Sequence, residues 1–266
     1  MERKAKCMRE KFKKGELVIG GHAFLTDPCI TELFGYHGFE FVWIDAEHGA
    51  FTLPCVQSHI QAAASADTAS IVRIAWNDPV LAKPVLEMGP DGIIFPYIRT
   101  PEETRKAMAA CMYPPKGIRG FGPRRANQYG VLEDREYLDA VDDSLLRMVQ
   151  VEHRDAVECL EDILAVEGLD LIVVGPCDLS ASYGMIGQTH DARMETIYDT
   201  IAEKCKRLGK PFGVSLGPSD EEGIKNWIDR GAVFMGCADD MNYMRMGSMK
   251  TLSMVRDYVR SRRQSI

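Results

Sequence analysis

Eight short apolar segments alternate with segments of helical periodicity along the chain, and this alternation limits the folds that the chain can adopt. Segments that are apolar on both faces and separated by helices are typical of parallel strands. Eight such units favour a closed (β/α)8 barrel, an α/β fold that takes ~250 residues, over an open doubly wound sheet. Because no linker or low-complexity stretch divides the 266 residues, we expect one domain over residues 1–266. The predicted strands are Leu17–Ala23, Phe39–Ile44, Ile71–Ala75, Gly92–Ile98, Leu145–Val151, Leu169–Val174, Phe212–Leu216 and Val233–Cys237.

Two further helices are expected outside the barrel repeat. Ala5, Met8 and Phe12 recur at helical spacing within Met1–Gly15, which predicts a short N-terminal helix that closes one end of the fold. Met241–Arg263 predicts a long, Met-rich C-terminal helix with a basic end. An apolar helix beyond the last strand often docks on a neighbouring subunit, so we expect a homo-oligomer.

The bulk composition excludes several classes of partner. A formal net charge of −7 argues against nucleic acid or an anionic membrane as the main partner. No segment approaches the ~20 apolar residues that a membrane-spanning helix needs.

The eight cysteines include no C-x-x-C pair, and no secretory leader precedes them, so we expect reduced thiols and a cytoplasmic protein.

Two acids, Glu152 and Asp178, follow directly on apolar segments, Leu145–Val151 and Leu169–Pro176. The intervening Arg154–Val166 has helical spacing, and the strand–helix–strand order places both acids at the carboxyl edge of a parallel sheet. Converging carboxylates repel one another unless a proton or a hard cation lies between them. We favour the cation, and oxygen ligands without a cysteine or histidine pair suit Mg²⁺ or Mn²⁺.

Four further polar residues are candidates for the same site. Arg73, inside an apolar strand, needs an anionic partner, which is either a neighbouring acid or, as the nearby carboxylates favour, an anionic ligand. Gln150 lies two residues before Glu152, so both face the barrel interior. His48 is a candidate proton-transfer group, its alternative being a hydrogen-bonded core or loop histidine. Glu87 could orient that imidazole or could be a solvated helix acid.

The lysine and glycine patterns narrow the classes of reaction that the chain could catalyse. No predicted strand contains a lysine, so a Schiff-base enzyme has no obvious nucleophile. Lys116–Gly130 is rich in glycine and arginine but matches neither a P-loop nor a dinucleotide fingerprint. Arg119, Arg124 and Arg125 in this segment could receive an anionic substrate tail or bind a neighbouring subunit.

With these residues assembled, the chain resembles the HpcH/HpaI aldolase/citrate lyase family, which contains class II pyruvate aldolases. The resemblance implies a barrel of the phosphoenolpyruvate/pyruvate-binding type, a role in the breakdown of aromatic or sugar acids, and a hexamer with exchanged C-terminal helices. It also implies one divalent metal, Mg²⁺, Mn²⁺ or Co²⁺, on Glu152 and Asp178. The motifs that carry the resemblance are Asp45–Gly49, Val72–Arg73 with Trp76–Pro79, Tyr113–Gly120, Val149–Glu152 and Gly175–Ser180.

The resemblance further implies how a 4-hydroxy-2-oxoacid would be cleaved to pyruvate and an aldehyde. Arg73 would face the enolate oxygen of pyruvate. Gln150, with Cys177–Asp178, would hold the pyruvate end of the substrate. His48 would act as the base through a water molecule, and Glu87 matches an acid that assists the histidine.

Two alternatives stay open at this point. A CoA-thioester lyase of the citrate lyase beta-like group uses similar carboxylates. A non-catalytic ketoacid-binding protein could retain the same fold. The chain departs from the common family pattern at Cys177, where alanine is usual, and at Glu87, where aspartate is usual; Tyr97, Arg99 and Ser215 also differ.

Overall fold

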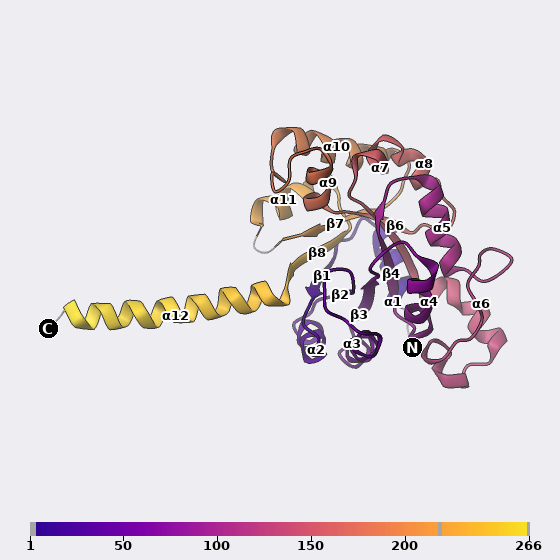
Figure 1. The fold of residues 1–266 in the computed structure, drawn as a ribbon, viewed down its shortest axis with the longest axis horizontal. Coiled ribbons are helices and arrows are strands. Elements are labelled where there is room, and N and C mark those ends of the chain that lie inside the picture. The colour runs from indigo at the N-terminus through magenta and orange to yellow at the C-terminus, as the bar shows by residue number, and fades with distance from the viewer. Residues whose placement is uncertain (1–3, 218–219, 265–266) are drawn as a thin grey trace.

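The computed structural model describes residues 4–217 and 220–264, and its eight strands close into a parallel barrel in chain order (Figure 1). β8 pairs in parallel with β1 and completes the ring. Each predicted strand is present, with ends shifted by at most two residues, so the predicted (β/α)8 barrel is confirmed. The strands are β1 (Val18–Ala23), β2 (Phe41–Asp45), β3 (Ala69–Arg73), β4 (Gly92–Ile98), β5 (Leu146–Val151), β6 (Leu171–Val174), β7 (Phe212–Leu216) and β8 (Phe234–Asp239).

Helices follow the strands around the outside of the barrel (Figure 1). Several begin at side-chain caps: Asp78 accepts from the N–H of Val80, and Thr100 accepts from that of Glu103. The helices are α1 (Lys4–Lys13), α2 (Cys29–Tyr36), α3 (Leu53–Ser65), α4 (Pro79–Glu87), α5 (Pro101–Cys111), the 3₁₀ segment η1 (Arg125–Gly130), α6 (Asp134–Ser144), α7 (Arg154–Glu158), α8 (Leu160–Leu164), α9 (Pro176–Ser182), α10 (Ala192–Arg207), α11 (Glu221–Arg230) and α12 (Asp240–Gln264).

The prediction of a single helix over Arg154–Val166 is wrong in one respect: the segment forms two helices, α7 and α8, which are separated at Cys159. The backbone there leaves the helical region, with φ −102° and ψ 24°. The Cys159 thiol donates to the carbonyl of Arg99, which ties this break to the segment after β4.

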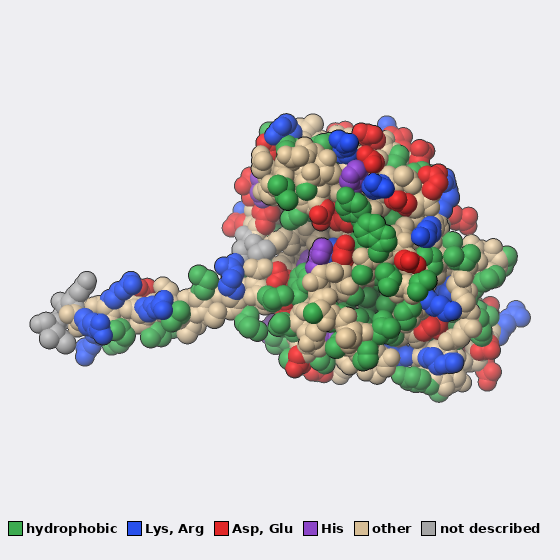
Figure 2. Space-filling model, viewed as in Figure 1, with side chains coloured by type: hydrophobic (Ala, Val, Ile, Leu, Met, Phe, Trp, Pro, Cys, Tyr) green, Lys and Arg blue, Asp and Glu red, His purple; other side chains and the backbone are tan. Residues whose placement is uncertain are grey.

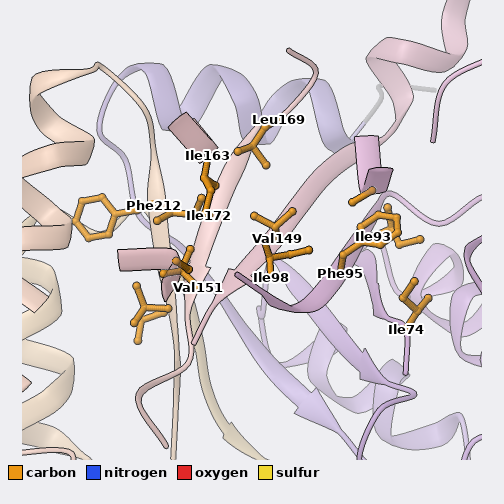
Figure 3. Close-up of a cluster of buried hydrophobic side chains, with 14 of the residues drawn as sticks. Ile74, Ile93, Phe95, Ile98, Val149, Val151, Ile163, Leu169, Ile172 and Phe212 are labelled. Atoms are coloured by element: carbon orange, nitrogen blue, oxygen red, sulfur yellow. The ribbon is translucent and has the colours of Figure 1, made fainter. Parts of the chain in front are cut away.

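Two apolar layers hold the barrel together. The inner layer fills the amino end of the barrel, and α1 covers it with Ala5, Met8 and Phe12, as predicted for the described part of that helix. The edge of the Phe12 ring lies against Phe234, with the ring centroids 6.4 Å apart. The outer layer lies between strands and helices, and Figure 3 shows part of it, with Phe95 and Val149 among the labelled side chains.

The C-terminal helix α12 projects away from the barrel (Figure 1). Its apolar side chains are exposed, and Figure 2 shows them beside lysine and arginine side chains along the projecting part. No helix among the described residues is long and apolar enough to cross a membrane. The exposed apolar residues of α12 include Met241, Met244, Met249, Leu252, Met254, Val255, Tyr258 and Val259.

Candidate active site

Inward-facing side chains change from apolar to polar along three of the barrel strands. Because side chains of a strand alternate between its faces, residues two apart point into the same interior. The amino-end residues fill the inner core, and the carboxyl-end residue is polar in each case. These series are Phe41, Trp43 and Asp45 on β2; Ala69, Ile71 and Arg73 on β3; and Leu146, Met148 and Gln150 on β5.

Arg73 is the centre of this polar layer. Its Nη2 donates to Asp45 Oδ2, and its Nη1 lies 2.8 Å from Glu47 Oε2. The same Nη1 donates to Gln150 Oε1 at 3.2 Å. Two neighbouring acids therefore balance the buried charge, which is the simpler of the two predicted explanations for an arginine in this strand. The Nε of Arg73 is buried without a hydrogen-bond partner among the described residues.

Glu152 continues the hydrogen-bonded chain from Gln150. Gln150 Nε2 donates to Glu152 Oε2 at 2.7 Å, and the main-chain N–H of Tyr97 donates to Glu152 Oε1 at 2.7 Å. Tyr97 reaches this position through a left-handed conformation, φ 53°, at the irregularity of β4. Burial, together with the charges of Glu47 and Asp178, raises the pKa of Glu152 to about 8.

Asp178 and Cys177 lie in the first turn of α9, directly after β6, and both are exposed. Besides burial, the charges of Asp178 and Glu152 raise the pKa of the Cys177 thiol. The charge of Asp178 also raises the pKa of Glu152, which indicates that the two predicted metal ligands lie near each other at the carboxyl end of the barrel. Gly175 makes room for Glu152, because a Cβ on this residue would lie 2.4 Å from Glu152 Oε2.

The two acids fit a divalent cation. Glu152 is desolvated and lies in the field of the Asp178 charge, and a hard cation would stabilise both carboxylates in place of the proton that Glu152 otherwise retains. The part of the chain that the structure describes holds no group of three or more aspartate, glutamate, histidine or cysteine side chains suited to a metal. With Glu152 and Asp178 as its ligands from the protein, such a cation would have its remaining positions open to water and substrate oxygens.

His48 lies beside this acidic group, whereas Glu87 does not meet His48 within the chain. His48 Nε2 lies 3.9 Å from Glu47 Oε2, and its side chain is 60% exposed. Glu87 is the last residue of α4, and β4 begins at Gly92, so Glu87 lies toward the amino end of the barrel. Its Oε1 lies 3.5 Å from Arg119 Nη2. The role of Glu87 stays a prediction.

The arginines of the Lys116–Gly130 segment make contacts inside the chain. Arg119 is buried and donates to the carbonyl of Leu86 and to the hydroxyl of Tyr137. Arg125 donates to the carbonyls of Met88 and Gly89, and Arg124 donates to that of Pro123. Arg119 and Arg125 therefore fasten this segment to the end of α4.

Three contributors to the site were not predicted as site residues: Glu47, the main-chain N–H of Tyr97, and Gly175. Glu47 stands in the predicted motif Asp45–Gly49, and its place directly after a strand was an available signal. The glycine that precedes Pro176 at the end of β6 was another such signal. The left-handed conformation of Tyr97 has no signature in residue type, because tyrosine rarely adopts it.

A (β/α)8 barrel with charged and polar side chains gathered at the carboxyl ends of its strands has the arrangement of a barrel enzyme. The chain belongs to the HpcH/HpaI aldolase/citrate lyase family, which it matches over residues 22–245. This confirms the predicted family, and membership implies a divalent metal.

Curated relatives and a solved structure agree with this assignment. The chain is 34% identical to a hydroxypyruvate/pyruvate aldolase of Sagittula stellata, over 89% of this chain and 92% of that protein. It is 32% identical to a 4-hydroxy-2-oxo-heptane-1,7-dioate aldolase of Salmonella dublin, over 91% of each. An HpcH/HpaI aldolase structure from Desulfitobacterium hafniense matches with a TM-score of 0.87 at 27% identity, covering 93% of this chain and 96% of that one. The predicted enzyme class, a lyase of the aldolase type, is confirmed.

Proposed function

We propose that this aldolase cleaves a 4-hydroxy-2-oxoacid to pyruvate and an aldehyde, with Mg²⁺ or Mn²⁺ as its divalent cation. The observation that carries the proposal is the hydrogen-bonded chain from Asp45 through Arg73 and Gln150 to Glu152. These hydrogen bonds hold the guanidinium group of Arg73 in a fixed position beside the carboxylates of Asp45 and Glu152. The names of the two aldolase relatives support the choice of a 2-oxoacid substrate.

Each side chain of the site would have a distinct task. Glu152 and Asp178 would hold the cation, which when bound polarises the oxo group of the substrate. Gln150 and the main chain at Cys177 would orient the pyruvate end. Arg73 would stabilise the negative charge that develops on the oxo oxygen as the carbon–carbon bond breaks. Because its carboxylate partners already hold Arg73 in place, this stabilisation costs little reorganisation.

His48 would transfer the proton of the 4-hydroxyl group. Its exposed imidazole can exchange protons with solvent. Glu47, which contacts both His48 and Arg73, couples the proton-transfer group to the cationic centre.

We also propose a cytoplasmic homo-oligomer, a hexamer by family resemblance, in which α12 docks on a neighbouring subunit. The support is the row of exposed apolar side chains on α12, since contiguous apolar surface of this kind usually marks an interface.

A coupled pyruvate assay tests the proposed reaction. The protein is stripped with a chelator and supplied with a panel of 4-hydroxy-2-oxoacids, with and without Mn²⁺ or Mg²⁺. The expected result is pyruvate release that requires the added cation. Cleavage of CoA thioesters in place of the oxoacids, or binding of oxoacids without any turnover, would contradict the proposal.

A further inference from the structure

Three aromatic side chains stand together at the carboxyl ends of β3, β4 and β5. The rings of Trp76 and Tyr97 are stacked, with centroids 5.7 Å apart and planes 28° apart. The Tyr97 ring meets the His153 ring edge to face, with centroids 5.6 Å apart and planes 62° apart. Such offset and edge-to-face pairs hold their members in fixed orientations.

This aromatic wall, formed by Trp76, Tyr97 and His153, borders the proposed metal site. Tyr97 donates its main-chain N–H to Glu152, and His153 is the next residue after Glu152. His153 is itself held, because its Nδ1 accepts from the N–H of Asp155 at the start of α7. A substrate anchored at Glu152 would therefore extend directly past these rings.

The outer member of the wall is open to a ligand. Trp76 is 53% exposed, whereas the other two tryptophans, Trp43 and Trp227, are almost completely buried. A large exposed aromatic surface beside a polar site is typical of a binding surface, since the surface gains free energy when a ligand covers it.

The charges around the wall disfavour a second carboxylate on the bound aldehyde. Arg99, two residues beyond Tyr97, already has an acidic partner, because its Nη2 lies 3.9 Å from Glu103 Oε1. Arg73 is already balanced by its neighbouring acids, and the nearby Glu47 and Asp178 would repel an added negative charge.

We propose that the aromatic wall is the aldehyde subsite and that it favours planar aromatic aldehydes over aliphatic and carboxylate-bearing ones. The inference rests on the proposed aldolase reaction, in which pyruvate occupies the other half of the site. An aromatic aldehyde would continue the stack that Tyr97 and Trp76 begin.

The decisive experiment compares aldol addition of pyruvate to benzaldehyde, to an aliphatic aldehyde of similar size and to succinic semialdehyde. For the wild-type enzyme we expect the highest kcat/KM with benzaldehyde. In the double variant Trp76→Leu/Tyr97→Leu this preference should fall about tenfold, because leucine offers no ring to stack on. Tyr36→Leu is the matched control, since Tyr36 is an exposed aromatic on α2, and it should retain the preference.

Two readouts separate this inference from the proposed function. Deuterium exchange at the methyl group of pyruvate reports the pyruvate half of the site without any aldehyde. Saturable quenching of Trp76 fluorescence by benzaldehyde, absent in Trp76→Leu, reports occupation of the wall. Normal exchange with no aromatic preference, or with no saturable quenching, would overturn the inference, whereas absent exchange in the wild type would overturn the proposed function instead.

Discussion

The main-chain N–H of Tyr97 and the carboxylate of Glu152 are joined by a 2.7 Å hydrogen bond that depends on an unusual backbone conformation. The left-handed φ of Tyr97 is costly for a residue with a side chain, and such strain concentrates at functional sites. Together with the donor from Gln150, it leaves Glu152 with one fixed orientation.

Gly175→Ala should disturb the site without disturbing the barrel. The added Cβ would lie 2.4 Å from Glu152 Oε2, so the carboxylate must move away from its two donors. We expect Mn²⁺ affinity to fall by ~10–100-fold, the usual effect of disturbing the support of a metal ligand. Isothermal titration calorimetry measures this, with Gly122→Ala as the control because nothing lies within 4 Å of its Cβ position. Equal affinities in the two variants would contradict the assigned role of Gly175.

Arg73→Lys should lower kcat by ~10²–10³, the usual loss when a donor to developing charge is removed. Lysine retains the positive charge, but it cannot contact Asp45, Glu47 and Gln150 simultaneously from one fixed plane. Steady-state pyruvate release measures the effect, and circular dichroism checks the fold. The exposed Arg154 supplies the control variant Arg154→Lys. Unchanged turnover in Arg73→Lys would refute charge stabilisation by this residue.

The barrel could be predicted because its strands are apolar on both faces and separated by helices. The two-residue period of a strand also placed Gln150 and Glu152 on the barrel interior. Glu47 escaped prediction as a site residue because it lies beyond the end of β2, where the two-residue period no longer fixes direction. The position of Glu87 toward the amino end of the barrel follows from the length and direction of α4, which a motif match does not encode.

His22 should make the protein less stable in acid. Burial lowers its pKa, and the neutral ring lies 2.8 Å from the Ala238 carbonyl through Nδ1 and 2.9 Å from the Ser215 hydroxyl through Nε2. The unfolded chain takes up a proton near pH 6.5, whereas the folded chain takes one up only at lower pH, so acidification below pH 6.5 favours unfolding.

Urea unfolding measured from pH 7 to pH 5 tests this effect. The free energy of unfolding should decline by about 1–2 kcal/mol more in the wild type than in His22→Gln. His37→Gln, at an exposed histidine, should decline as the wild type does. Parallel curves for the wild type and His22→Gln would show that His22 does not titrate as described.

Polar substitutions on α12 should shift the protein from the proposed homo-oligomer toward smaller species. Met249→Glu combined with Leu252→Glu places charge on exposed apolar positions of a helix that projects from the barrel. We expect a smaller sedimenting species with unchanged circular dichroism. Lys250→Gln combined with Arg256→Gln also lowers the net charge by two, so it controls for the change in charge. A wild-type chain that sediments as a monomer would contradict the proposed docking of α12.

The central claim is that Glu152 and Asp178 together hold one divalent cation. Titration of the chelator-treated protein with Mn²⁺, followed by electron paramagnetic resonance, tests it most directly. We predict one bound ion per chain in the wild type, retained in the control Glu158→Gln and lost in both Glu152→Gln and Asp178→Asn. Wild-type affinity in both of those variants would contradict the account.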